Sequence, residues 1–343
     1  MAIFRHTQDL PAEARGCVVA IGNFDGVHRG HQAILRATAD LAGRLGCRHA
    51  VLTFEPHPRR FFQPDAPPFQ LTSFRLKARL IESLGVDHIF FLTFNRALSE
   101  LSAEAFVRDI LVRDLQIRHA IVGDNFRFGH KRAGTVARLE ATGAEFGFGV
   151  TVLDRVTGSD DEPYSSTAVR RYLQAGDPTR AALLLGRYWE IEGRVQVGER
   201  LGRKLGFPTA NIPLGETLEP ARGIYAVRAG VDRGERTVWH PGVANLGVRP
   251  TLGDDGQVLL EVHLFDVDED LYGQHMRVAL VDYLRPEWKF DSLDAMTLQM
   301  QEDSRRARVI LAGERWEAGW PSIAFEPVRK GRGKGERGPG PAS

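Results

Sequence analysis

The sequence predicts an α/β domain built on a parallel sheet, followed by a small antiparallel β-barrel domain with a C-terminal helix. From about residue 17 to residue 186, short apolar runs alternate with amphipathic helical stretches, which is typical of strands joined by crossover helices. After Arg187 the apolar runs are β-branched or aromatic, with no helical stretch between them, as in an antiparallel sheet or small barrel. A chain of 343 residues is also longer than one typical core supports. We therefore expect domains at 1–186 and 187–312.

Five apolar runs predict the strands of the first domain, namely CVVAIG, HAVLTF, HIFFLTF, HAIVG and GVTVLD. After the first run, apolar residues recur at helical spacing from Gly30 to Leu45. The segment FEPHPRRFFQPDAPPFQLT follows the second run and contains too many prolines for regular structure. Loops of that length are usually functional. Near Gly176 one helix is expected to end, and a short one follows it up to Gly186.

The strands of the second domain are predicted at YWEIEGRVQV, GIYAVRAGV, TVWHPGVANLGV, VLLEVHLFDV and MRVALVDYL. From Ser292 to about Leu311, apolar residues return at helical spacing and can share one face. Residues 313–343 are basic and hold too few apolar side chains to fold, so we expect a flexible tail there.

Composition excludes several classes of protein. The 45 Lys and Arg residues nearly balance the 44 Asp and Glu residues, which argues against nucleic-acid binding driven by net charge. No apolar run reaches the roughly 18 residues of a membrane span, and the first residues do not resemble a signal peptide. Cys17 and Cys47 are the two cysteines, so a disulfide framework is not expected. We expect a cytoplasmic protein with no membrane or specific nucleic-acid partner, and its oligomeric state is open.

The string GNFDGVHRGH, residues 22–31, sets two imidazoles three positions apart where the first strand passes into the first helix. His28 and His31 thus lie at the first helical turn, where unpaired N–H groups and the helix dipole favour an anion. Gly26 and Gly30 allow close approach of the backbone. A pair of histidines in an arbitrary sequence more often caps a helix or fills a core, but here strand, glycines and helix meet at one point. We expect a phosphate site.

GNFDGVHRGH resembles the HxGH signature of nucleotidylyltransferases, and more narrowly the adenylyltransferase half of the bacterial bifunctional riboflavin kinase/FAD synthetase family. The resemblance implies a Rossmann-like domain in which the FMN phosphate attacks the α-phosphorus of ATP. Ligands of such folds bind at the carboxyl ends of the strands. Four clusters fall there in family order, which are GNFDGVHRGH, TFEPHPRRF, GDNFRFG and SSTAVR.

The resemblance assigns His28 and His31 to the transferring phosphate and Arg170 to the triphosphate. Ser166 and Thr167 also fit a helix N-cap, and we expect one of them to fill it. Glu55, His57 and Arg59 could be read as a metal cluster, although the family pattern favours a loop that lines the flavin side. The residues expected to bind ATP or flavin are Gly22, Asn23, Phe24, Asp25, Gly30, Asn125, Phe126, Ser165, Ser166 and Thr167.

In the second domain, GRVQVGERLGRKLGFPTAN is not a Walker A loop, because no GK[ST] ends it. On spacing alone, its glycines fit the turns of a small barrel. The segment also resembles the riboflavin kinase signature, which implies a glycine-rich flap over ATP and Mg²⁺ held by Thr209 and Asn211, whose neutral oxygens suit that ion.

By the same resemblance Glu261 is the base for the ribityl 5′-hydroxyl. Its neighbours Leu260 and Val262 are apolar, so the alternation of a strand points Glu261 to the other face. The remaining residues expected at the kinase site are Gly193, Gly198, Gly202, Gly206, Phe207, Asn245, Arg249, Thr251, Arg285, Phe290 and Gln299. The implied substrates are riboflavin, FMN and ATP, and the implied cofactor is Mg²⁺.

Two alternatives remain open on the sequence. One is an adenylyltransferase for another phosphorylated acceptor such as a pantetheine phosphate, whose family lacks the appended barrel and the GFPTAN segment. The other is a non-enzymatic nucleic-acid-binding protein that uses the β domain as a reader and the basic tail as an anchor. Against it, the β segments lack an evident row of exposed aromatic residues with interleaved basic ones.

Overall fold

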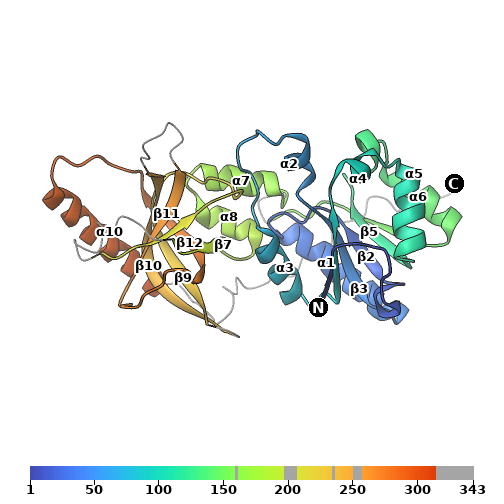
Figure 1. The fold of residues 1–343 in the computed structure, drawn as a ribbon, viewed down its shortest axis with the longest axis horizontal. Helices are drawn as coiled ribbons and strands as arrows, with labels where there is room; N and C mark the ends of the chain where they lie inside the picture. Colours follow the sequence, from blue (N-terminus) through green and yellow to red (C-terminus); the bar gives the residue numbers. More distant parts are fainter. Residues whose placement is uncertain (159–160, 197–206, 234–235, 250–256, 314–343) are drawn as a thin grey trace, which may run out of the picture.

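The computed structural model describes residues 1–158, 161–196, 207–233, 236–249 and 257–313. A parallel sheet with helices on its faces lies at one end of the molecule, and an antiparallel barrel lies at the other (Figure 1). The helices α7 and α8 lie between them. Both halves of the predicted fold class are confirmed.

The first sheet has six parallel strands in the order β1-β4-β3-β2-β5-β6. Five of them are the predicted runs. The sixth, β1, pairs with β4 at the edge of the sheet and was missed. The strand bounds are β1 Ala2–Phe4, β2 Val18–Ile21, β3 His49–Glu55, β4 His88–Thr93, β5 His119–Gly123 and β6 Gly149–Leu153.

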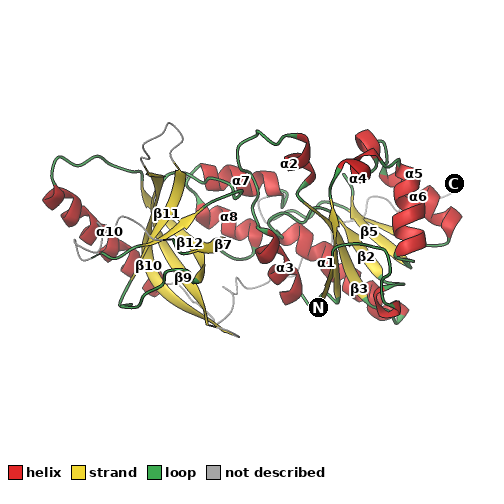
Figure 2. Cartoon of the chain, in the orientation of Figure 1, coloured by secondary structure: helices red, strands yellow, loops and turns green. Residues whose placement is uncertain are grey.

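Helices cover both faces of this sheet (Figure 2). The face with α1 and α3 holds one apolar cluster around Phe24, Leu35 and Leu76, and the π-helical segment Phe106–Asp114 and α6 bury the other face. The α-helices of this half are α1 Arg29–Leu45, α2 Pro58–Phe62, α3 Phe74–Ser83, α4 Arg96–Glu100, α5 Ala103–Ala105, α6 Val136–Phe146, α7 Ser166–Gln174 and α8 Pro178–Leu185, with short 3-10 turns at Ala12–Ala14 and His130–Arg132. The expectation that the proline-rich segment has no regular structure is wrong at α2, because Pro58 occupies a first-turn position that needs no N–H donor.

The second sheet is antiparallel, in the order β7-β12-β9-β10-β11-β8. Gln196, just after β7, donates its N–H to the carbonyl of Asn211 in β8 at 2.8 Å, so the two edges of the sheet meet. Strand β8 was not predicted as a strand, because the sequence analysis assigned its segment, which contains Asn211, only to metal binding. The bounds are β7 Trp189–Arg194, β8 Ala210–Pro213, β9 Gly223–Arg233, β10 Arg236–Arg249, β11 Gln257–Leu264 and β12 His275–Arg285, and the helix α10 Leu293–Gly313 follows.

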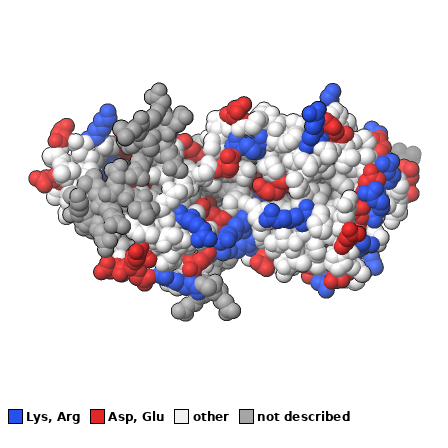
Figure 3. Space-filling model, in the orientation of Figure 1, with Lys and Arg blue, Asp and Glu red and all other residues white. Residues whose placement is uncertain are grey.

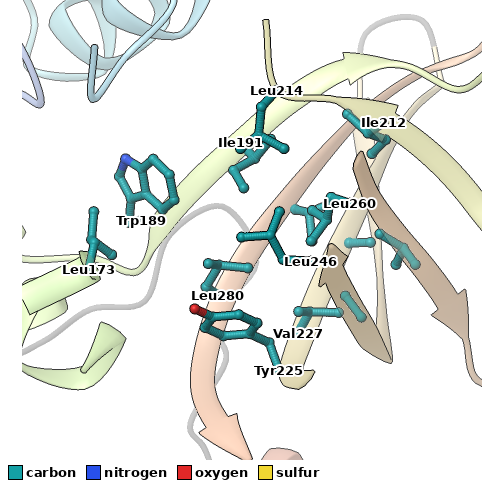
Figure 4. Close-up of a cluster of buried hydrophobic side chains, with 14 of the residues drawn as sticks. Leu173, Trp189, Ile191, Ile212, Leu214, Tyr225, Val227, Leu246, Leu260 and Leu280 are labelled. Carbon is teal, nitrogen blue, oxygen red and sulfur yellow. The ribbon is translucent and has the colours of Figure 1, made fainter. Parts of the chain in front are cut away.

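The helices α7 and α8 share an apolar core with the barrel. Figure 4 shows Leu173 of α7 beside Trp189, and a cluster that includes Leu246, Leu260 and Leu280 inside the barrel. The indole N–H of Trp189 donates to the carbonyl of Leu71, in the segment before α3, at 2.8 Å. The two halves are therefore packed and hydrogen-bonded together.

The surface has no strong bias of charge on the face that Figure 3 shows, where acidic and basic side chains are interspersed. In the described ranges, none of the helices is both long and apolar enough to cross a bilayer.

A buried ion pair fastens α10 to the barrel. The guanidinium of Arg285 donates to Asp303 from Nε at 3.0 Å and from Nη2 at 2.6 Å, and both side chains are buried. We expect Asp303→Ala to lower the free energy of unfolding of the barrel by about 3–5 kcal/mol, because it leaves a buried guanidinium without its counter-charge. Urea unfolding measures this. Glu302→Ala, which removes an exposed partner of Arg305, is the control and should leave the curve unchanged; equal curves for both variants would contradict the prediction.

Candidate active sites

His28 is the N-cap of α1. Its Nδ1 accepts the backbone N–H of His31 at 3.3 Å, and the two imidazole rings stack with centroids 3.7 Å apart. Because Nδ1 is an acceptor, the neutral ring of His28 carries its proton on Nε2. The capping interpretation and the functional one are therefore compatible, since the cap uses one nitrogen and leaves an N–H donor for a ligand.

Two glycines allow this loop to pack. A Cβ on Gly30 would lie 3.1 Å from the ring of His28 and 3.2 Å from the carbonyl of Tyr164. Gly26 has φ +83°, and a Cβ there would lie 2.8 Å from a side-chain carbon of Leu71. Their role in the structure is close packing of the loop against the protein itself.

Two side chains that the sequence analysis missed hydrogen-bond to the backbone of the loop at residues 22–31. Arg187 is buried and donates from Nη2 to the carbonyl of Gly26 at 2.7 Å. Gln32 donates from Nε2 to the carbonyls of Val27 and Leu185, at 2.9 and 2.8 Å. Val27 has φ +42°, an uncommon conformation for a β-branched residue, so these bonds fix a backbone that would otherwise relax.

Asp25 joins two of the four predicted clusters, its own and SSTAVR, to the end of the proline-rich segment. Its carboxylate accepts the backbone N–H groups of Leu71 and Thr72, at 2.9 and 3.1 Å, and forms an ion pair with Arg170. Arg170 also donates from Nε to the carbonyl of Phe69 at 2.8 Å. The hydroxyl of Ser166 donates to the carbonyl of Asp25 at 2.8 Å.

The N-cap of α7 is Ser165, whose Oγ accepts the N–H of Ala168 at 3.1 Å. The expectation that Ser166 or Thr167 caps this helix is wrong, because the helix begins one residue earlier and both already have helical positions. Ser166 uses its hydroxyl on the loop of Asp25 instead.

The other predicted residues of this half lie around the same edge. Asn125 and Phe126 follow β5, the neighbour of β2, and Asn125 is exposed. Phe126 stacks on Phe128 with centroids 5.4 Å apart. No contact among the described residues joins these two to the histidines. Gly22 and Asn23 follow β2 directly, and Phe24 is buried with its ring 5.1 Å from that of His31.

In the loop after β3, the structure gives His57 and Arg59 contacts within the protein. His57 caps α2 by accepting the N–H of Arg59 on Nδ1 at 3.1 Å, and the guanidinium of Arg59 lies 4.5 Å from the ring centroid of Phe69. Within the described ranges, no group of three His, Cys, Asp or Glu side chains is arranged to hold a metal ion.

The histidines of this site are kept neutral. Burial, assisted by the charges of Arg187 and Arg170, lowers the pKa of His28 to about 3. Burial also lowers the pKa of His31 well below its ordinary value, with further effects of His28 and Lys77, and lowers that of His57 to about 4. A neutral imidazole N–H next to arginine charges suits an anionic ligand.

These shifts predict acid sensitivity. The unfolded chain binds a proton on each of these histidines below about pH 6.5 and the folded chain does not, so the free energy of unfolding falls as the pH drops from about 6.5 toward about 3. Between pH 7 and pH 5, His28 alone accounts for about 2 kcal/mol of this loss. The test is urea unfolding of the unmodified protein and of His28→Asn, which keeps a capping acceptor, at pH 7 and at pH 5. We expect the free energy of unfolding of His28→Asn to fall by about 2 kcal/mol less between these pH values than that of the unmodified protein. Equal losses would contradict the assignment.

The candidate kinase site contains a cavity of about 200 Å³ at one end of the barrel. Thr209 and Asn211, the predicted metal ligands, line it, and Asn211 is buried. Asp268, Glu269 and Asp270 line it too, and the sequence analysis missed them. The carboxylate of Glu269 forms an ion pair with Arg233, and that of Asp270 accepts the N–H of Tyr272. The polar residues in the wall all carry side-chain oxygen atoms.

Glu261 lies in the middle of three polar residues on neighbouring strands. In β11 it stands opposite Asn211 of β8 on one side and opposite Asn245 of β10 on the other. Its neighbours Leu260 and Val262 point into the barrel core, so these three residues share the outer face, as the alternation predicts. The Oδ1 atom of Asn245 is buried and has no hydrogen-bond partner in the described part of the chain.

The remaining residues predicted for the kinase site lie in several different parts of the second domain. A Cβ on Gly193 would lie 2.8 Å from Ile212, so this glycine allows β7 and β8 to approach. The ring of Phe207 lies 5.2 Å from that of His263. Gln299 donates to Asp303 at 3.0 Å, and Phe290 lies beside Arg285. Arg249 ends β10, and Gly198, Gly202, Gly206, Thr251 and nearly all of the predicted tail lie outside the described residues.

Comparison with known proteins covers both halves of the chain. A family model described as FAD synthetase matches residues 10–168, and one described as riboflavin kinase matches residues 185–311. The chain is 42% identical over 90% of its length to a protein of Escherichia coli strain K12 named "Bifunctional riboflavin kinase/FMN adenylyltransferase", of which 97% is covered.

A protein of the same name from Pseudomonas fluorescens is 44% identical, with 91% of this chain and 98% of the relative covered. A crystal structure titled as a macrolide-efflux protein from Streptococcus pneumoniae aligns with a TM-score of 0.78 at 27% identity. That alignment covers 89% of this chain and 98% of the other, so the likeness extends over both halves of the fold.

Proposed function

Since the chain belongs to the family of bifunctional riboflavin kinase/FMN adenylyltransferases, it phosphorylates riboflavin to FMN and transfers the adenylyl group of ATP to FMN, and we propose which residues perform each reaction. We assign adenylyl transfer to residues 1–186 and phosphorylation to residues 187–312. Neither a different phosphorylated acceptor nor nucleic-acid binding is favoured. The cytoplasmic location expected from the sequence stays a prediction.

In the first domain we assign His28 and His31 to the α-phosphate of ATP and Arg170 to the rest of the triphosphate. A phosphate oxygen of FMN attacks the α-phosphorus in line, and pyrophosphate leaves with the electron pair of the broken bond. The protein supplies position and charge rather than a nucleophile. The Nη1 atom of Arg170 takes part in neither of its two side-chain hydrogen bonds, to Asp25 and to the carbonyl of Phe69, and is the donor we assign to the triphosphate.

One observation carries this assignment. The cap on Nδ1 fixes the ring of His28, directs its Nε2 donor away from the helix backbone and stacks it on His31 at the positive end of α1. Preorganised donors of this kind stabilise charge on phosphoryl oxygens without reorganising during the reaction.

In the second domain we assign Glu261 as the base for the 5′-hydroxyl of riboflavin and Thr209 and Asn211 as ligands of Mg²⁺. The residues fit the ion, because a cavity walled by hydroxyl, amide and carboxylate oxygens suits a hard cation. When bound, Mg²⁺ would neutralise charge on the phosphates of ATP. Glu261 stands one strand away from Asn211, so it can accept the proton of a hydroxyl held beside the phosphates.

The experiment that tests the proposal is incubation of the purified chain with riboflavin, ATP and Mg²⁺, followed by chromatographic separation of the flavins. FMN should appear first and FAD second, with ADP and pyrophosphate as the other products. Excess EDTA should stop the formation of FMN, and added Mg²⁺ should restore it. FMN formation that continues in EDTA would contradict the metal assignment.

A further inference from the structure

Lys77 is a buried lysine that none of the assignments above explains. It lies on α3 among buried residues that include Leu76, Ala78 and Ile81, and it is 2% exposed. Lysine is almost never this deeply buried unless it is paired. In the part of the chain that the structure describes, its ammonium group has no hydrogen-bond partner. A polar group in this state costs stability.

The surroundings of Lys77 are those of the adenylyltransferase site. Its helix follows directly on Leu71 and Thr72, whose N–H groups bind the carboxylate of Asp25. Asp25 and Glu55 are the charges that act on Lys77, and the charge of Lys77 acts in turn on His31 and His57. Burial lowers the pKa of Lys77 from its ordinary value, whereas the two carboxylates favour its charged form.

Neither carboxylate already satisfies Lys77. Asp25 accepts three hydrogen bonds from Leu71 and Thr72 and pairs with Arg170. Glu55 ends β3, and burial raises its pKa above the ordinary value although Lys77 opposes that rise. Asp25 is thus already occupied, and in the described residues no hydrogen bond or ion pair joins Lys77 to Glu55, so the ammonium group can donate to an anion that a ligand supplies.

We propose that Lys77 binds the phosphate of FMN, the group that attacks ATP. This inference rests on the proposed function of the site. The charge of Lys77 acts on His31, which we assign to the α-phosphate, and on His57, in the segment that we expect on the flavin side. Arg170 is available for the triphosphate. The ammonium group keeps its proton throughout, and it brings the attacking phosphate to the α-phosphorus while reducing repulsion between the two anions.

The test is steady-state kinetics of FAD formation with Lys77→Met, Lys77→Arg and, as a control on the exposed side of the same helix, Arg75→Met. For Lys77→Met we expect the KM for FMN to rise at least about tenfold, the usual scale for a lost hydrogen bond to a charged group. The KM for ATP should change less than about twofold. Lys77→Arg should recover part of the affinity for FMN, and Arg75→Met should match the unmodified protein.

Stability separates this role from a structural one. Removing an unpartnered buried charge should leave the urea midpoint of Lys77→Met equal to or above that of the unmodified protein. A lower midpoint in Lys77→Met, or a rise in the KM for ATP with an unchanged KM for FMN, would overturn the inference. Riboflavin phosphorylation by the same samples should be unchanged. Failure of the unmodified protein to make FAD from FMN would instead remove the proposed function, and this inference with it.

Discussion

Replacing His28 or His31 by alanine is expected to lower the rate of FAD formation from FMN and ATP by at least about a hundredfold. That is the usual scale for losing a preorganised donor to a transition state. The ring of His28 is fixed by its cap on the N–H of His31, and the two rings stack 3.7 Å apart. Removing either ring takes away one donor and also the support of the other. Steady-state assay of FAD from supplied FMN measures the effect.

Two controls separate chemistry from folding in this experiment. Phosphorylation of riboflavin by the same variants should stay normal, because neither histidine lines the cavity of the candidate kinase site. His6→Ala, at an exposed histidine, should leave both reactions unchanged. Near-normal FAD formation in both His28→Ala and His31→Ala would remove the histidines from the mechanism.

The second large effect is expected at Glu261. Glu261→Ala should lower the formation of FMN from riboflavin by at least about a hundredfold, within the range that general bases contribute, while supplied FMN is still converted to FAD. The residue stands between Asn211 and Asn245 in the register of the barrel, beside the cavity wall that holds the candidate metal ligands.

Measuring both reactions distinguishes a catalytic role of Glu261 from a structural one. Loss of both reactions together, with a lowered urea midpoint, would mean that the residue is structural. Glu302→Ala on α10 removes an exposed carboxylate of the same domain and should change neither reaction.

The fold could be predicted because it depends on periodic patterns. Alternation of apolar runs and helical stretches gave five of the six parallel strands and the antiparallel second half. The missed strand β1 has only three residues, Ala2–Phe4, and is a strand because β4 offers an unpaired edge. A partner distant in the chain, rather than local propensity, decides such a case.

The residues of the site could be predicted from the sequence only where they belong to a short local motif. His28 and His31 are found from a string that joins a strand to a helix. Arg187 and Lys77 have no such string, since each acts on the loop at residues 22–31 from a distant part of the chain. A lysine among the apolar residues that follow the proline-rich segment is a signal in the sequence that could have indicated Lys77.

The central claim is that two separate sites act in succession, and one mixing experiment tests it most directly. His28→Ala and Glu261→Ala are each incubated with riboflavin, ATP and Mg²⁺, and are then combined in equal amounts. We expect His28→Ala alone to stop at FMN, Glu261→Ala alone to leave riboflavin unchanged, and the mixture to produce FAD. Formation of FAD by either variant alone would contradict the account. So would a mixture that makes no FAD although His28→Ala makes FMN and Glu261→Ala converts supplied FMN to FAD.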